Sequence, residues 1–332
     1  MIISRTPFRI SFFGGGTDYP AWYKENGGAV LSASIDKYCY LTCRYLPPFF
    51  EHKTRVVWSK IETVAQTEEI QHPAIRETIK FLGIQDGLQI HHDADLPARS
   101  GIGSSSSFTV GLLNSLYTLL GKSPTKTQLA LEAIHVEQEL VKENVGSQDQ
   151  SAAAFGGFNK IEFGGPDHIR VTPIGISQAD LDALQSHLML FFTGFARNAS
   201  EIAAEQIRLT SQKAKELKIM YSMVNTAEEL LEKRDFDGFG KLLHENWKIK
   251  RTLSSQISNN AIDEIYELGK SAGALGGKLL GAGAGGFILF FVKPEHQERV
   301  KAALSKLLYV PIKFEKEGSQ IIFNNGAKTY TS

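Results

Sequence analysis

Cysteine is scarce in this chain, which has two among its 332 residues. Cys39 and Cys43 share one face of an expected strand, and a rise of about 3.3 Å per residue places them roughly 13 Å apart. A disulfide needs Cα atoms within about 7 Å of each other. We therefore expect free thiols and a reducing, cytoplasmic location.

Net charge is also lacking, because 36 Lys and Arg residues balance 36 Asp and Glu residues. This removes the bulk electrostatic argument for a nucleic-acid or anionic-membrane partner. No apolar run reaches the roughly 18 residues of a membrane span. A signal-peptide layout is absent too, since Arg5 and Arg9 interrupt the first apolar residues. We expect a globular protein that binds neither nucleic acid nor membranes, and the sequence is compatible with a homodimer.

Glycine and serine are concentrated in residues 95–113, where Gly101 and Gly103 precede four serines, Ser104 to Ser107. Apolar residues at helical spacing follow, so the serines would begin a helix. The N–H groups and dipole of a first helical turn suit an anion such as phosphate. A lone loop of this kind is more often an ordinary capped helix, and this one matches neither a Walker A motif nor a Rossmann fingerprint.

Two further glycine segments favour the phosphate interpretation. Gly14 to Gly16 lead into Thr17-Asp18-Tyr19, and a second glycine loop covers residues 281–286. With the serine loop, they resemble the three motifs of the GHMP kinases (galactokinase, homoserine kinase, mevalonate kinase and relatives) in order and spacing. The central motif, roughly Pro-x-x-x-Gly-Leu-Gly-Ser-Ser, matches residues 97–105, where Ile102 replaces the leucine.

The resemblance implies an α+β fold, the two-domain GHMP kinase fold. Residues 1–180 would form the N-terminal part, which is similar to ribosomal protein S5 domain 2. Residues 181–332 would form a ferredoxin-like antiparallel sheet with helices, and the active site would lie between the two parts. The residue pattern agrees: strands dominate before residue 60, with a turn at Asp36-Lys37, and helices are expected at 127–144, 199–233, 236–253 and 260–272.

The resemblance also implies a role for each motif residue. Asp149 and Arg9 would be catalytic, and Ser105 and Glu137 would hold Mg²⁺ bound with ATP. The residues expected to bind the ATP phosphates are Gly101, Gly103, Ser104, Ser105 and Ser106. Those expected to bind the substrate are Gly15, Gly16, Thr17, Asp18, Tyr19, Arg197 and Gly283.

Two of these assignments have competing interpretations. Without the motif, Glu137 would be one of several surface acids on a charged helix. Arg197 would be nearly as well explained as an exposed structural arginine. A metal site at His91, Asp93 and Asp95 is a minor alternative, because the spacing matches no common zinc pattern.

Within the superfamily the chain most resembles kinases of D-glycero-D-manno-heptose 7-phosphate, through the segments GGGTDYP, PARSGIGSSSSFTVGLLN and TGFARNAS. Those enzymes phosphorylate the anomeric hydroxyl, and the 1,7-bisphosphate serves nucleotide-activated heptose and surface polysaccharide synthesis. The expected partners are therefore ATP and a small sugar phosphate. A kinase for fucose or another sugar, and a non-catalytic sugar or nucleotide sensor on the same fold, are the alternatives.

Overall fold

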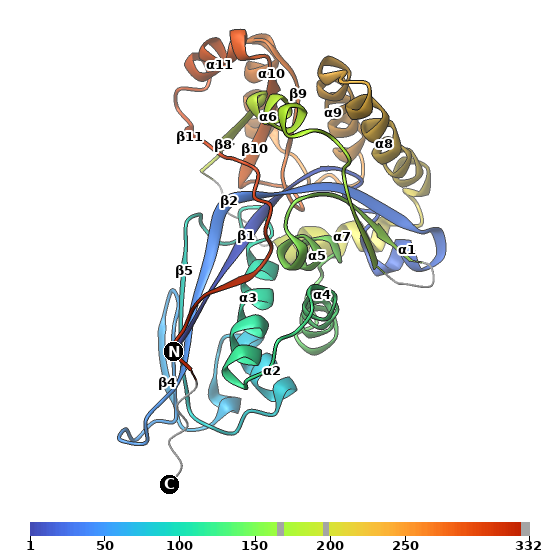
Figure 1. The fold of residues 1–332 in the computed structure, drawn as a ribbon. Coiled ribbons are helices and arrows are strands. Elements are labelled where there is room, and N and C mark those ends of the chain that lie inside the picture. Colours follow the sequence, from blue (N-terminus) through green and yellow to red (C-terminus); the bar gives the residue numbers. More distant parts are fainter. Residues whose placement is uncertain (165–168, 195–198, 327–332) are drawn as a thin grey trace.

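The computed structural model describes residues 1–164, 169–194 and 199–326. It contains one large sheet and one small sheet, with helices packed against both (Figure 1). In the large sheet the order is β12-β1-β2-β5-β3-β4, and β6 and β7 continue from one half of β2. The bounds are β1 Ile2–Phe13, β2 Gly28–Tyr45, β3 Thr54–Val57, β4 Ile61–Val64, β5 Leu88–Ala94, β6 Phe158–Phe163, β7 Ile169–Pro173 and β12 Gln320–Asn324.

Strand β2 is the longest strand of the large sheet and runs through the expected turn at Asp36-Lys37. Phe8 of β1 pairs with Ile35, whereas Pro7 pairs with Tyr38, so two residues of β2 are accommodated as a bulge. The backbone N–H of Asp36 donates to the carbonyl of Lys313 at 2.9 Å, which gives the bulge a partner outside the ladder. The turn expected there is wrong, because a bulge bends and twists a strand without ending it.

The helices of the first half of the chain lie on one side of the large sheet (Figure 1). Helix α3 packs against β1 and β2, and nearly every one of its side chains is buried. The single helix expected at 127–144 is instead α4, capped by Thr125, followed by one π-helical turn, Val136–Leu140. The bounds of the helices are α1 Pro20–Asn26, α2 Pro73–Leu82, α3 Ser104–Leu119, α4 Lys126–His135 and α5 Gln148–Phe155.

The small sheet has the order β11-β8-β10-β9 and is antiparallel throughout. Its strands are β8 Leu188–Phe192, β9 Ala274–Leu279, β10 Phe287–Val292 and β11 Leu308–Val310. The helical region expected at 199–233 is two helices, and the later helices agree with the pattern. Their bounds are α6 Gln178–Ser186, α7 Ala199–Leu209, α8 Ala214–Glu232, α9 Phe236–Lys250, α10 Asn260–Ser271 and α11 Gln297–Ala303.

Aromatic packing joins the two sheets. Phe12 of β1 lies edge-on to Phe239 of α9 at 5.6 Å, and Phe239 contacts Phe291 of β10 at the same centroid distance. All three side chains are fully buried within one cluster. Because β1 is fixed to the small sheet in this way, the loop that follows β1 and the loop that precedes β10 line the same cavity.

Two expectations from composition can be compared with the structure. Cys39 and Cys43 are free and buried, as predicted. Among the residues that the structure describes, no helix is long and apolar enough to cross a membrane.

Candidate active site

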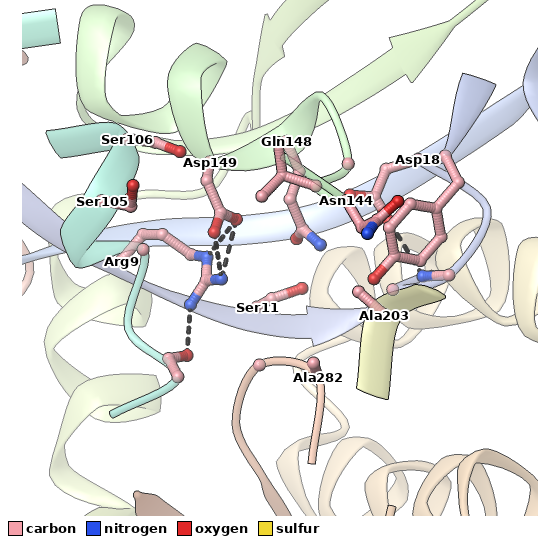
Figure 2. A pocket seen from close by; sticks show the side chains of 18 of the residues that line it. Arg9, Ser11, Asp18, Ser105, Ser106, Asn144, Gln148, Asp149, Ala203 and Ala282 are labelled. Carbon is pink, nitrogen blue, oxygen red and sulfur yellow. Dashed lines mark hydrogen bonds and ion pairs between the residues drawn. The ribbon is translucent and has the colours of Figure 1, made fainter. Parts of the chain in front are cut away.

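A cavity of about 200 Å³ lies where the loops after β1, before α3 and before β10 meet. Most of the motif residues line it, and Figure 2 shows Arg9 and Asp149 near Ser105 and Ser106 at one end of the cavity and Asp18 at the other. The predicted residues in its wall are Arg9, Gly15, Gly16, Asp18, Tyr19, Gly101, Gly103, Ser104, Ser105, Ser106 and Asp149. Arg9 and Asp149, which are 140 positions apart in the sequence, therefore share one site.

The serine loop and the third glycine loop pack backbone to backbone. Gly101 has a φ of 83°, and a Cβ added to it would lie 2.3 Å from the carbonyl oxygen of Leu280. A Cβ on Gly281 would lie 2.5 Å from the Cα of Gly101. A further hydrogen bond, from the N–H of Phe287 to the carbonyl of Ser100 at 3.1 Å, holds the loops together. Only glycine permits this close approach of the two backbones. The approach sets the shape of the cavity beside Ser104, Ser105 and Ser106.

The N-terminus of α3 is presented to the cavity. Gly103 precedes the helix with a φ of 76°, and the N–H of Ser107 makes the bond to the Gly103 carbonyl at 2.9 Å. The N–H groups of the turn before it are those that an α-helix leaves without an intrahelical acceptor. Ser104, Ser105 and Ser106 all line the cavity, so this turn combines backbone donors, hydroxyls and a positive helix end. Such an arrangement is suited to an anion such as phosphate.

Arg9 and Asp149 form a two-pronged ion pair beside this helix end (Figure 2). The Nε of Arg9 donates to Oδ1 of Asp149 at 2.8 Å, and Nη2 donates to Oδ2 at 2.7 Å. Nη1 donates to the carbonyl of Gly101 at 2.6 Å, so the guanidinium also touches the serine loop. The Arg9 side chain is 4% exposed and that of Asp149 is 25% exposed, which leaves the carboxylate accessible from the cavity.

Glu137 is buried behind the serines. Its residue is 1% exposed, so the interpretation as a surface acid is wrong. The carboxylate accepts hydrogen bonds from Ser105 at 3.2 Å, Ser106 at 2.7 Å and Thr109 at 2.8 Å, and also from the Gln150 amide. Burial raises the pKa of Glu137, and the hydrogen bonds oppose that rise. The carboxylate and the Ser105 hydroxyl are oxygen donors of the kind that Mg²⁺ prefers, so they fit the predicted metal.

The loop after β1 fixes Asp18 at the far end of the cavity. One carboxylate oxygen accepts the N–H of Gly16 at 2.8 Å, and burial raises the pKa of Asp18, which is 2% exposed. Thr17 does not line the cavity; its hydroxyl donates to the carbonyls of Gly14 and Ala29 and closes the loop.

Two other predicted substrate residues, Gly283 and Arg197, have different outcomes. Gly283 is not part of the cavity wall, and its neighbours Gly281 and Ala282 are. Arg197 lies outside the described residues, so its predicted role remains a prediction. Among the described residues, no group of three or more His, Cys, Asp or Glu side chains is arranged to bind a metal. The alternative metal site at His91, Asp93 and Asp95 is therefore wrong.

Sequence reasoning missed several polar side chains in the cavity wall, among them Ser11, Gln148, Lys250 and Lys278. Lys250 and Lys278 are 4% and 3% exposed. The available signal was weak: Lys278 is a charged residue in a strand that is otherwise apolar or glycine, and Lys250 ends a helix with charges on several sides. Their importance follows from the fold, which brings α9 and β9 beneath β1.

The N-terminus of α3 and the Arg9–Asp149 pair, around one cavity of an α+β fold, are an arrangement suited to phosphoryl transfer. The family models described as GHMP kinases N terminal domain and GHMP kinases C terminal match residues 69–157 and 227–310, more than half of the chain. The chain belongs to the GHMP kinase family and is an ATP-dependent phosphotransferase.

Individual relatives agree with this assignment. A D-glycero-alpha-D-manno-heptose 7-phosphate kinase of Campylobacter jejuni is 30% identical over 96% of this chain and 97% of its own. A bifunctional fucokinase/GDP-fucose pyrophosphorylase of Arabidopsis thaliana is 24% identical over 86% of this chain and 29% of its own. The crystal structure of a D-glycero-D-manno-heptose 1-phosphate kinase from Bacteroides thetaiotaomicron superposes with a TM-score of 0.77, at 25% identity over the whole of both chains.

Proposed function

We propose that this enzyme transfers the terminal phosphoryl group of ATP to the anomeric hydroxyl of D-glycero-D-manno-heptose 7-phosphate, giving the 1,7-bisphosphate. The observation that carries the chemistry is the Arg9–Asp149 pair, which faces the cavity beside the N-terminus of α3. The full-length similarity to a heptose 7-phosphate kinase supports the choice of substrate. The product would enter nucleotide-activated heptose synthesis in the cytoplasm.

In this proposal the ATP phosphates bind the first turn of α3 and the backbone of Gly101 and Gly103. The acceptor hydroxyl binds Asp149, which orients it toward the phosphoryl group and accepts its proton as transfer proceeds. Arg9, held between Asp149 and the serine loop, stabilises the negative charge of the transferring group. Phosphoryl transfer depends mainly on positioning and charge neutralisation, so Asp149 does not need an unusually basic carboxylate.

Ser105 and Glu137 are the residues that would hold Mg²⁺. When bound there, Mg²⁺ would supply positive charge beside the phosphate oxygens. The Ser105 hydroxyl already lies 3.2 Å from a Glu137 oxygen, next to the cavity. Glu137 carries three further hydrogen bonds, so its side chain is positioned before ATP arrives.

Substrate recognition would fall to Gly15, Gly16, Asp18 and Tyr19 in the cavity wall, with Arg197 and Gly283 as the further predicted contacts. Two glycines after Gly14 leave space at this point, and Asp18 can accept hydrogen bonds from sugar hydroxyls. A heptose 1-phosphate acceptor, which the name of the Bacteroides enzyme indicates for that protein, and fucose are the competing substrates.

ADP release in the presence of Mg²⁺ and ATP tests the proposal. The acceptors to compare are heptose 7-phosphate, heptose 1-phosphate, fucose, mannose, galactose and mevalonate. The proposal expects kcat/KM to be highest for heptose 7-phosphate. Preferred turnover of fucose or heptose 1-phosphate would overturn the acceptor and keep the chemistry, whereas no turnover on any acceptor would favour a sensor.

A further inference from the structure

Two buried lysines, Lys250 and Lys278, line the cavity and have no role in the phosphoryl transfer proposed above. Lys250 ends α9 and Lys278 lies in β9, and both side chains reach the cavity under the loop that follows β1. In the described part of the chain, neither ammonium lies within ion-pair distance of a carboxylate. Asp18 attracts both lysines without forming an ion pair with either. Buried charges are normally paired, so two buried lysines that face one cavity without a paired carboxylate indicate an anionic ligand.

The hydrogen bonds of the two lysines hold them in place without neutralising them. The Nζ of Lys250 donates to the carbonyl of Gly15 at 3.2 Å and to the side-chain oxygen of Gln206 at 3.0 Å. The Nζ of Lys278 donates to the carbonyls of Ser11 and Phe12 at 2.8 and 3.1 Å. An ammonium has three N–H donors, so each lysine retains one donor for a ligand.

A second, independent observation points into the same space. Ser11 is 4% exposed, lines the cavity, and its hydroxyl has no hydrogen-bond partner among the described residues. The side-chain oxygen of Gln148 is likewise buried and without a partner there. Figure 2 shows Ser11 and Gln148 between the Arg9–Asp149 pair and Asp18. A Cβ on Gly15 would lie 3.7 Å from the Ser11 hydroxyl and 3.8 Å from the Gln148 amide nitrogen, so both face the space that Gly15 leaves open.

We propose that Lys250 and Lys278, with the Ser11 hydroxyl, bind the phosphate monoester that the sugar acceptor already carries, and that the Gln148 carbonyl oxygen accepts a hydrogen bond from a sugar hydroxyl. This inference rests on the proposed function, in which the acceptor is a sugar phosphate. Burial, with the nearby charges of Lys250 and Arg9, holds the pKa of Lys278 well below its usual value, and a phosphate dianion bound beside both lysines would favour their charged forms. Ser11 donates a hydrogen bond to one of the phosphate oxygens. Gln148, next to Asp149 on α5, contacts the sugar between its phosphate and the reacting hydroxyl.

The positions of Lys250 and Lys278 in the cavity indicate that they bind the sugar acceptor and not ATP. Their hydrogen-bond partners are residues 11–15, which belong to the end of β1 and the first glycine loop, and Gln206 on α7. The donors suited to ATP, by contrast, are on α3 and in the serine loop. Lys250, Lys278 and Ser11 would therefore favour a phosphorylated sugar over the same sugar without its phosphate, although both carry the same anomeric hydroxyl.

The test compares two acceptors, heptose 7-phosphate and unphosphorylated heptose, in the wild type and in the variants Lys250→Met, Lys278→Met and Ser11→Ala. The measured quantity is the ratio of kcat/KM for the phosphorylated acceptor to that for the free one. Removing one charged hydrogen-bond donor should lower this ratio about ten- to hundredfold in each lysine variant, and about tenfold or less for Ser11→Ala. The KM for ATP should change little.

Lys248→Met is the matched control, because Lys248 lies on the same helix, pairs with Glu245 and does not line the cavity. Its acceptor ratio should equal that of the wild type. Ser11→Ala removes a hydroxyl that has no partner, so it should fold normally even if a lysine variant does not, and thermal unfolding checks this.

The outcomes separate the two proposals. A wild type that prefers heptose 7-phosphate, with variants that keep this preference, overturns the lysine site and leaves the function standing. Loss of the preference in Arg197→Ala alone also overturns the lysine site. A wild type that uses the free heptose as well as the phosphate, or neither, overturns the sugar-phosphate acceptor and this inference with it.

Discussion

Arg9 and Asp149, which are 140 positions apart in the sequence, meet through two parallel hydrogen bonds of 2.8 and 2.7 Å. Two parallel N–H donors to one carboxylate fix both distance and orientation. The arginine is buried and the aspartate partly exposed, so the pair offers a positioned carboxylate to a ligand in the cavity. Phosphoryl transfer between ATP and a hydroxyl group needs this kind of fixed geometry.

Asp149→Asn should keep the fold and ATP binding but lose most turnover. The substitution preserves shape and removes the charge that orients the acceptor hydroxyl and accepts its proton. The expected decrease in kcat is about 10²- to 10⁴-fold. Steady-state kinetics together with the dissociation constant for ATP measure both effects, and near-normal kcat would remove Asp149 from the mechanism.

Gly101→Ala should destabilise the protein by about 2 kcal/mol or more, because it adds backbone strain to a steric clash. The new methyl group would lie 2.3 Å from the Leu280 carbonyl at a φ of 83°. Gly121→Ala is the control, since Gly121 has a φ of 74° with nothing within 4 Å of its added Cβ. Urea unfolding of both variants gives the difference in the free energy of unfolding. Equal losses would show that the two glycine loops do not need their close approach.

Glu137→Gln and Ser105→Ala should raise the Mg²⁺ concentration required for half-maximal activity by about tenfold or more, because each removes an oxygen ligand of the proposed site. Glu132→Gln serves as the control, because Glu132 is a carboxylate on α4 that accepts a hydrogen bond from Gln128 and does not line the cavity. Magnesium titrations at saturating ATP measure the effect. An unchanged requirement in both test variants would assign the metal to other residues.

Binding of a phosphorylated acceptor should weaken as the pH rises through about 8. Burial lowers the pKa of Lys250 to about 8, although Asp18 opposes this shift. Below that pH the lysine is charged and attracts a phosphate whose second pKa is about 6. Above it the lysine is neutral and the attraction is lost. The KM for heptose 7-phosphate between pH 6.5 and 9.5 should therefore rise at the alkaline end.

Lys250→Arg is the matched variant for this pH dependence, because arginine stays protonated throughout the range. The KM of this variant for heptose 7-phosphate should not change as the pH rises above about 8. This holds even if its KM differs from that of the wild type. A rise of equal steepness in the variant and the wild type would assign the pH effect to another group.

Local patterns predicted the glycine loops, because each motif is a continuous segment whose residue types alone suit a turn and a helix N-terminus. They also predicted free cysteines and most helices. Glu137 was predicted by its spacing from Asp149, but its burial follows from packing of the π-helical turn against α3, which no local pattern reveals.

Long-range packing explains what the sequence did not predict. Lys250 and Ser11 face one cavity only because α9 and β1 pack together through Phe239 and Phe12. Asp36 marks a bulge instead of a turn because a distant segment near Lys313 supplies a hydrogen bond to it. Such partners are separated by more than 200 residues and carry no signal in a local window.

The position of the new phosphate in the product tests the central proposal most directly. The enzyme would be incubated with heptose 7-phosphate, Mg²⁺ and ATP, and the purified product examined by phosphorus and carbon NMR. The account predicts a bisphosphate in which the second phosphate is coupled to the anomeric carbon. A phosphate on any other carbon, or recovery of unreacted heptose 7-phosphate from an enzyme that phosphorylates another sugar, would contradict it.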